Sequence, residues 1–144
     1  MGLQQGVPAR NDGFQNIQFL RQRVTFDGSA GIAYNANRDN LGAGIFNLGA
    51  LPAGSIIVAP ISGVDVNTVF NAGTNNRLNI GITGTAAKWA SVLTLLGLGF
   101  IPMAVAAGHR LAADTTILVT LDITGTAPTT GDMEIVVAYI TPNG

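Results

Sequence analysis

Apolar and polar residues alternate along several stretches of the chain, with the period of two that is typical of a β-strand with one buried face. The clearest stretches are residues 64–70, 78–83 and 117–123. Residues 133–141 are apolar on both faces, which predicts a strand in the centre of its sheet or one covered by another subunit. Short strands separated by turn signals predict an all-β sandwich or barrel.

Turn signals separate these strands. Leu51-Pro52-Ala53-Gly54 predicts a tight turn between residues 44–48 and the apolar run 55–61, because proline presets φ and glycine accepts positive φ. The pentapeptide Ile-Thr-Gly-Thr-Ala occurs at residues 82–86 and again at 123–127. Each copy ends an alternating stretch, which indicates a recurring way of leaving a strand.

Residues 89–108 form an uncharged, strongly apolar stretch of the length that spans a bilayer. Two glycines and a proline inside it disfavour a lone membrane helix, because no neighbour would satisfy the interrupted backbone. We therefore expect two buried strands, at 92–96 and 100–106, preceded by a short helical turn at 86–90. A membrane anchor remains the alternative.

The first 23 residues differ in composition from the rest. They contain all five glutamines and three of the six arginines, and Pro8 and residues 11–13 interrupt any regular element. We predict an extended N-terminal arm over residues 1–23, ordered against a partner, and a sandwich domain over 24–144. The expected apolar anchors of this arm are Phe14, Ile17, Phe19 and Leu20, and the expected partners for carboxylates of another protein are Arg10, Arg21 and Arg23.

Charge is sparse along the whole chain. Charged residues make up 10% of the sequence and hydrophobic residues 47%, against about 25% charged residues in an average soluble domain. This composition fits a subunit whose faces are covered by neighbours, although a monomer with a neutral polar surface has a similar composition. The net charge of −1, without a basic block, gives no sign of nucleic-acid binding.

Candidate chemistry is scarce. The chain has one histidine, His109, and no cysteine, and His109 follows a glycine in a predicted turn with no catalytic motif around it. None of the four serines lies in a Gly-x-Ser-x-Gly elbow. Asp65 and Asn67 begin a faint calcium-loop pattern that lacks its central glycine and final glutamate. We expect neither an enzyme nor a metal or cofactor site.

Three segments carry a resemblance to a known family. They read Phe46-Asn-Leu-Gly-Ala-Leu-Pro-Ala-Gly-Ser-Ile-Ile-Val, then Val64-Asp-Val-Asn-Thr-Val-Phe-Asn, then Leu78-Asn-Ile-Gly-Ile-Thr. Their order resembles the jelly-roll decoration (cement) proteins of tailed bacteriophages, and residues 114–140 resemble the closing hairpin of those proteins. The resemblance implies an all-β, jelly-roll-like two-sheet β-sandwich.

The same resemblance implies a role. Such a protein binds the outer surface of the virion shell after synthesis in the cytoplasm of the bacterial host, and it bridges neighbouring capsomers. The implied partners are the major capsid protein and further copies of the chain in a homodimer or homotrimer, with neither nucleic acid nor membrane. The alternative is a glycan-binding module of a phage tail or adhesin, which predicts Trp89, Tyr34 and Tyr139 on one exposed face.

Overall fold

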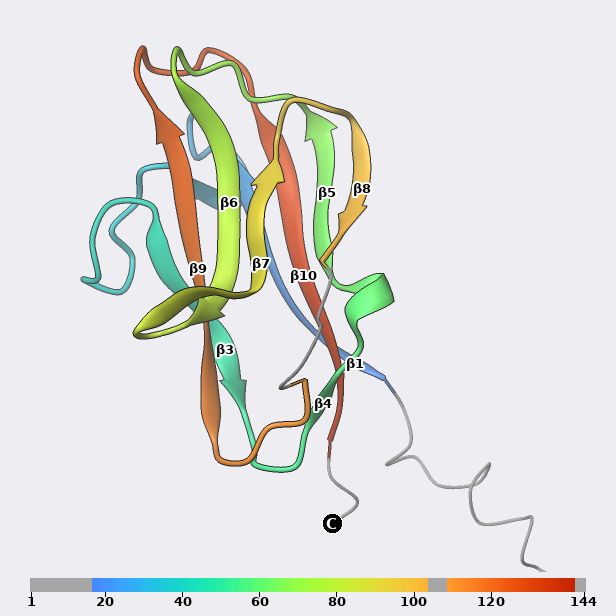
Figure 1. The fold of residues 1–144 in the computed structure, drawn as a ribbon. Coiled ribbons are helices and arrows are strands. Elements are labelled where there is room, and N and C mark those ends of the chain that lie inside the picture. Colours follow the sequence, from blue (N-terminus) through green and yellow to red (C-terminus); the bar gives the residue numbers. More distant parts are fainter. Residues whose placement is uncertain (1–16, 104–108, 142–144) are drawn as a thin grey trace, which may run out of the picture.

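Two β-sheets packed face to face make up the molecule (Figure 1). The computed structural model describes residues 17–103 and 109–141. The strands are β1 (Gln18–Thr25), β2 (Ile32–Ala33), β3 (Ile45–Leu51), β4 (Ile56–Ile57), β5 (Gly63–Thr68), β6 (Asn75–Ile82), β7 (Thr85–Thr94), β8 (Gly99–Pro102), β9 (Thr115–Thr124) and β10 (Asp132–Ile140). A short 3-10 helix, η3 (Ala59–Ile61), separates β4 from β5.

The strand order is that of a jelly roll. One sheet, called here the β10 sheet, has the order β2-β1-β10-β5-β8, with β4 also paired to β10. The other, the β9 sheet, has the order β3-β9-β6-β7. Apart from β2, which is parallel to β1, all neighbours are antiparallel. Strands from opposite ends of the chain are neighbours in both sheets: β1 pairs with β10, and β3 pairs with β9. This pairing is expected for two interlocked Greek keys. The predicted all-β, jelly-roll-like sandwich is confirmed.

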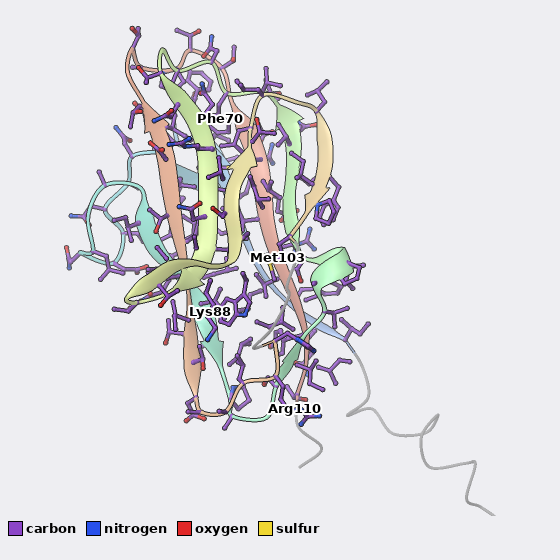
Figure 2. The ribbon with its side chains drawn as sticks, in the orientation of Figure 1. Phe70, Lys88, Met103 and Arg110 are labelled. Carbon is purple, nitrogen blue, oxygen red and sulfur yellow. The ribbon has the colours of Figure 1, made fainter. Side chains whose placement is uncertain are left out.

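The core lies between the two sheets and follows the predicted alternation. Every second residue of β5, β6, β9 and β10 points inward, and the fully buried members include Val64, Leu78, Ile80, Ile117, Val119, Met133 and Ile135. Phe70 is buried toward the end of the sandwich where loops join β5 to β6 and β9 to β10 (Figure 2). Strand β10 lies between β1 and β5, which explains its apolar residues on both faces.

The predicted helical turn at residues 86–90 is wrong, because these residues belong to β7. A two-residue turn at Thr83 and Gly84 joins β6 to β7, and Gly84 has a φ of 85° that glycine adopts without strain. Both copies of the repeated pentapeptide do end a strand, β6 and β9 respectively. No helix among the described residues is long and apolar enough to cross a membrane.

The boundary of the predicted arm also needs correction. Residues 18–25 form β1, which pairs with β10 without interruption from Gln18 opposite Tyr139 to Thr25 opposite Asp132. The sandwich therefore begins at Gln18 rather than at residue 24. The remainder of the arm, residues 1–16, lies outside the described part of the chain.

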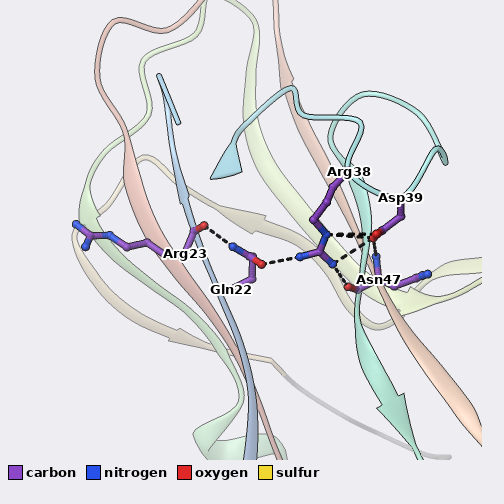
Figure 3. Close-up of polar contacts among 5 residues, drawn as sticks. All are labelled: Gln22, Arg23, Arg38, Asp39 and Asn47. Carbon is purple, nitrogen blue, oxygen red and sulfur yellow. Dashed lines mark hydrogen bonds and ion pairs between the residues drawn. The ribbon is translucent and has the colours of Figure 1, made fainter. Parts of the chain in front are cut away.

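Arg38 closes one side of the sandwich, between β1 and β3 (Figure 3). Its guanidinium donates to Gln22 Oε1 at 2.6 Å, to the carbonyl oxygen of Asn47 and to the carboxylate of Asp39. It also lies 5.1 Å from the ring centroid of Phe46, within cation–π range. The planar fork of arginine suits this position because it serves several acceptors at once.

Candidate partner-binding surface

The face of the β10 sheet that points away from the core, called here the outer face, carries three of the five predicted binding residues that the structure describes. Leu20, Val24 and their β10 partners Val137 and Met133 point into the core. Because neighbouring residues of a strand point to opposite faces, the intervening side chains point outward. On adjacent strands the outer face comprises Phe19, Arg21, Arg23, Glu134, Val136, Asp65, Asn67 and Phe100.

Two bidentate ion pairs cross from β1 to β10 on this face. Arg21 donates to both carboxylate oxygens of Glu134, at 3.1 and 2.6 Å. Arg23 donates to both oxygens of Asp132, at 2.9 and 2.7 Å. The hydrogen bond from Arg23 holds the pKa of Asp132 below its usual value, and the same pair raises the pKa of Arg23. The two arginines predicted to meet carboxylates of a partner are therefore already paired within the chain.

These pairs still leave charge accessible to a partner. The side chains of Arg21 and Arg23 are 59% and 51% exposed. Beside them lies a shallow hollow of about 230 Å³, lined by Arg23, Asp65, Asn67, Asp132, Met133 and Glu134. Carboxylates outnumber arginines in its lining, so the hollow suits a basic or hydrogen-bond-donating side chain. Within the described residues no group of three or more His, Cys, Asp or Glu side chains is arranged to hold a metal ion.

The predicted apolar anchors differ in exposure: two are exposed on the surface, and one packs against the core. Ile17 and Phe19 are 43% and 51% exposed at the start of β1, so both are available to a partner. Leu20 packs against the core, and a Cβ atom added at Gly49 on β3 would lie only 2.6 Å from its Cδ2 atom. The side chain of Leu20 faces the opposite sheet and contributes to the fold, and its role as a partner anchor stays a prediction. Arg10 and Phe14 lie outside the described residues.

The aromatic residues expected for glycan binding do not gather on one exposed face. Trp89 is 2% exposed and belongs to the core, and the Nζ atom of Lys88 lies 5.4 Å from its ring centroid. Tyr139 is partly buried, and its hydroxyl donates to Gln18 Oε1 at 3.0 Å. The alternative of a glycan platform built on Trp89 therefore loses its main residue.

Sequence reasoning missed the acidic partners of this surface. Glu134 and Asp132 are 113 and 109 residues away from the arginines that they bind, so their proximity depends on the pairing of β1 with β10. Their position on the polar side of an alternating strand was visible, but nothing in the sequence linked them to β1. Phe100 was missed because residues 92–96 and 100–106 were predicted as two buried strands. That prediction of burial is wrong for Val92, Leu96 and Phe100, which are exposed.

Comparison with known proteins gives a match at the level of fold. No protein-family model and no curated protein sequence matches the chain. A solved structure described as "Cyanophage Pam1 capsid asymmetric unit" contains a similar chain, with a TM-score of 0.54 and 18% sequence identity. The similarity covers 88% of this chain and 86% of that chain. The two chains therefore share a fold over nearly their whole lengths.

Proposed function

We propose that this protein is a structural component of a phage virion, and more specifically a decoration (cement) protein. In this role it binds the outer surface of the capsid and stabilises the shell by bridging neighbouring capsomers. Its partners are the major capsid protein and further copies of itself, in a homodimer or homotrimer. It uses no cofactor, catalyses no reaction and needs neither nucleic acid nor a membrane.

The observation that carries this proposal is the jelly-roll strand order together with its similarity to a chain of a cyanophage capsid assembly. The fold alone does not determine a function, because jelly rolls also occur in lectins and cupins. A lectin-like role loses support from the burial of Trp89. The agreement in length, with more than four fifths of each chain covered, favours a protein of the same kind over a shared subdomain.

The outer face of the β10 sheet is the proposed capsid-binding surface. Ile17 and Phe19 are exposed at the start of β1, on the same sheet as the two ion pairs. The combination of exposed apolar side chains with accessible charge is typical of a protein interface, in which a dry centre is surrounded by a polar rim. A homodimer or homotrimer carries several copies of this surface. It gains avidity from simultaneous contacts, even where each contact is weak.

The direct test uses the full-length protein and shells purified from the phage that encodes it. Unexpanded and expanded shells are incubated with increasing amounts of protein, and the bound fraction is measured by co-sedimentation. We expect saturation at a fixed number of copies per capsomer, and density on the outer surface of the saturated shells by electron microscopy. Absence of saturable binding to either form of the shell would overturn the proposal.

A substitution at the proposed surface adds residue-level evidence. Phe19→Ser removes an exposed aromatic anchor, and we expect it to weaken shell binding ~10-fold or more, as for an interface hot spot. Leu41→Ser is the matched control, because Leu41 is similarly exposed at 46% but lies on the loop before β3. Equal binding by both variants would remove Phe19 from the interface.

A further inference from the structure

Exposed apolar side chains concentrate at one edge of the sandwich. Four of the eight large hydrophobic residues that are exposed in the described part of the chain lie between residues 92 and 100. Their exposed fractions are 51% for Val92, 64% for Leu96, 71% for Leu98 and 44% for Phe100. These four residues are called here the edge patch. Val92 lies on the outward side of the β9 sheet and Phe100 on the outer face of the β10 sheet, with Leu96 and Leu98 on the chain segment between them. Exposed large apolar side chains that gather in one region commonly mark interaction sites.

The edge patch lies where both sheets end. Strand β7 is the last strand of the β9 sheet and β8 is the last strand of the β10 sheet. The chain passes from one to the other through the loop at residues 95–98 (Figure 1). A Cβ atom added at Gly97 or Gly99 would have no heavy atom within 4 Å. The described part of the molecule therefore leaves this loop uncovered.

The backbone next to the patch is strained. Val92 has a φ of 57°, a left-handed conformation that is unfavourable for a β-branched residue. It lies in a bulge of β7, where Ser91 and Val92 are opposite Asn79 of β6, and its N–H donates to Asn79 Oδ1 at 2.7 Å. A glycine would adopt this conformation without strain. The bulge and the hydrogen bond to Asn79 hold Val92 in this conformation, with half of its side chain exposed.

The usual protection of edge strands is missing at the patch. Proteins cover or charge such edges because unpaired backbone groups and apolar side chains recruit other chains. Lys88 near the start of β7 and Pro102 at the end of β8 disfavour pairing with another chain at the two ends of this edge. No charged residue lies between them in the sequence. Within the part of the chain that the structure describes, the middle of the edge is thus uncharged, apolar and uncovered.

We propose that copies of this chain associate with one another through the edge patch. Charge complementarity favours a second copy as the occupant, because an uncharged patch matches another uncharged patch and would leave the charges of an ordinary protein surface unpaired. Leu96 and Leu98 of each copy meet around a rotation axis, with Val92 and Phe100 at the two sides of the contact, which gives a closed oligomer. Ser91 and Thr94, both exposed beside the patch, supply a polar rim.

This inference deepens the proposed function, since a clamp that bridges capsomers needs several copies in one unit. Phe100 also belongs to the outer face of the β10 sheet, whereas Val92, Leu96 and Leu98 lie outside the proposed capsid-binding surface. The test therefore changes only Leu96 and Leu98. Self-association is measured without shells. A monomeric protein that still binds shells and an oligomer that does not bind them would therefore identify which of the two ideas has failed.

The test measures the mass of the purified full-length protein by sedimentation velocity and light scattering, over about 1 to 100 μM. We expect a single defined oligomer. The double substitution Leu96→Asp and Leu98→Asp places like charges opposite one another, and we expect it to weaken association ~100-fold or more. Leu41→Asp is the control, with the same change in charge at an exposed leucine away from the patch. A monomeric wild type, or an unchanged oligomer in the double variant, would overturn the proposal.

Cross-linking keeps the proposal testable if the charged variant fails to fold. The natural chain has no cysteine, so Leu96→Cys, Leu98→Cys and Leu41→Cys each introduce a single thiol. A short bismaleimide reagent should join copies of the first two variants efficiently and leave the third largely unlinked. Cross-linking confined to Leu41→Cys, or equal in all three variants, would contradict association through the edge patch.

Discussion

Ser62 supplies a hydrogen-bond acceptor at a gap in the β10 ladder. Strand β10 pairs with β5 from Asp132 to Val136, and with β4 at Tyr139 and Ile140. Between them the N–H of Ala138 donates to Ser62 Oγ at 2.8 Å, and the Ser62 hydroxyl donates to the carbonyl oxygen of Val58 at 2.7 Å. Ser62 is completely buried. We expect Ser62→Ala to lower the free energy of unfolding by about 1–3 kcal/mol, because it leaves a buried N–H without its acceptor.

Urea unfolding measures this loss as a lower midpoint at an unchanged m-value. Ser55→Ala is the matched control, since Ser55 is equally buried but its hydroxyl has no hydrogen-bond partner in the described part of the chain. We expect that variant to be neutral or slightly more stable, because it removes an unpaired polar group. Equal losses in the two variants would mean that Ser62 acts through packing rather than through the ladder.

At the residue scale the sequence showed which residues are apolar. It did not show which of them lie in a strand or which side chains hydrogen-bond to the backbone. The apolar run at 55–61 contains only the two-residue strand β4, followed by η3. Pro60 lies within η3 and has no N–H to donate, which disfavours an extended strand over the whole run. The role of Ser62 was not predicted, because it depends on Ala138, which is 76 residues away.

The ion pairs between β1 and β10 make the stability of this strand pair depend on pH. The pKa of Asp132 is lowered in the folded protein, chiefly by the hydrogen bond from Arg23. A lowered carboxyl pKa stabilises the fold above the unfolded value of about 3.9, and this contribution is lost as the pH falls through the folded value. We therefore expect Arg23→Gln to lower the urea midpoint at pH 7 by a small amount, and the difference from wild type to shrink below pH 4.

The double-mutant cycle with Asp132→Asn isolates this effect. In that background Arg23→Gln should change the midpoint little, and its effect should no longer depend on pH. A difference that persists undiminished as the pH falls below the lowered pKa of Asp132 would show that Arg23 stabilises β1 through its aliphatic stem.

Strands were predicted correctly where apolar and polar residues alternate regularly. They were predicted wrongly where the local composition indicated a helix or an arm. Strands β5, β6, β9 and β10 follow their sequence pattern closely. Strand β7 was predicted in part as a helical turn, because alanine and lysine favour helices, whereas pairing with β6 determines the outcome. Strand β1 was assigned to an arm because glutamines and arginines outnumber its apolar residues. Its inward residue Gln22 is polar because its side-chain oxygen accepts a hydrogen bond from Arg38. Nothing in the sequence indicated this contact.

The whole molecule has three distinct lateral surfaces with different chemistry. Arg38 closes the side between β1 and β3 with hydrogen bonds inside the chain. The outer face of the β10 sheet combines ion pairs with exposed aromatic residues, and the opposite edge carries the uncharged edge patch. This division follows from the jelly-roll order, which places β1 and β3 on one side and β7 and β8 on the other. The low overall charge predicts extensive contacts with neighbours, and the surfaces proposed for these contacts follow from the strand order.

The extent of the sandwich leads to a prediction about truncation. The described core residues lie between Leu20 and Tyr139, so removal of residues 1–16 should leave a cooperative thermal transition within a few degrees of that of the full-length protein. Removal of residues 1–23 deletes most of β1, which withdraws Leu20 from the core and exposes one ladder edge of β10. We expect this longer truncation to lose cooperative unfolding or to aggregate. Circular dichroism melts of both proteins provide the comparison, and co-sedimentation with expanded shells then tests whether residues 1–16 contribute to capsid binding. If the longer truncation melts like the full-length chain, residues 18–23 are an attached arm after all, and the ion pairs of β1 are unnecessary for the fold.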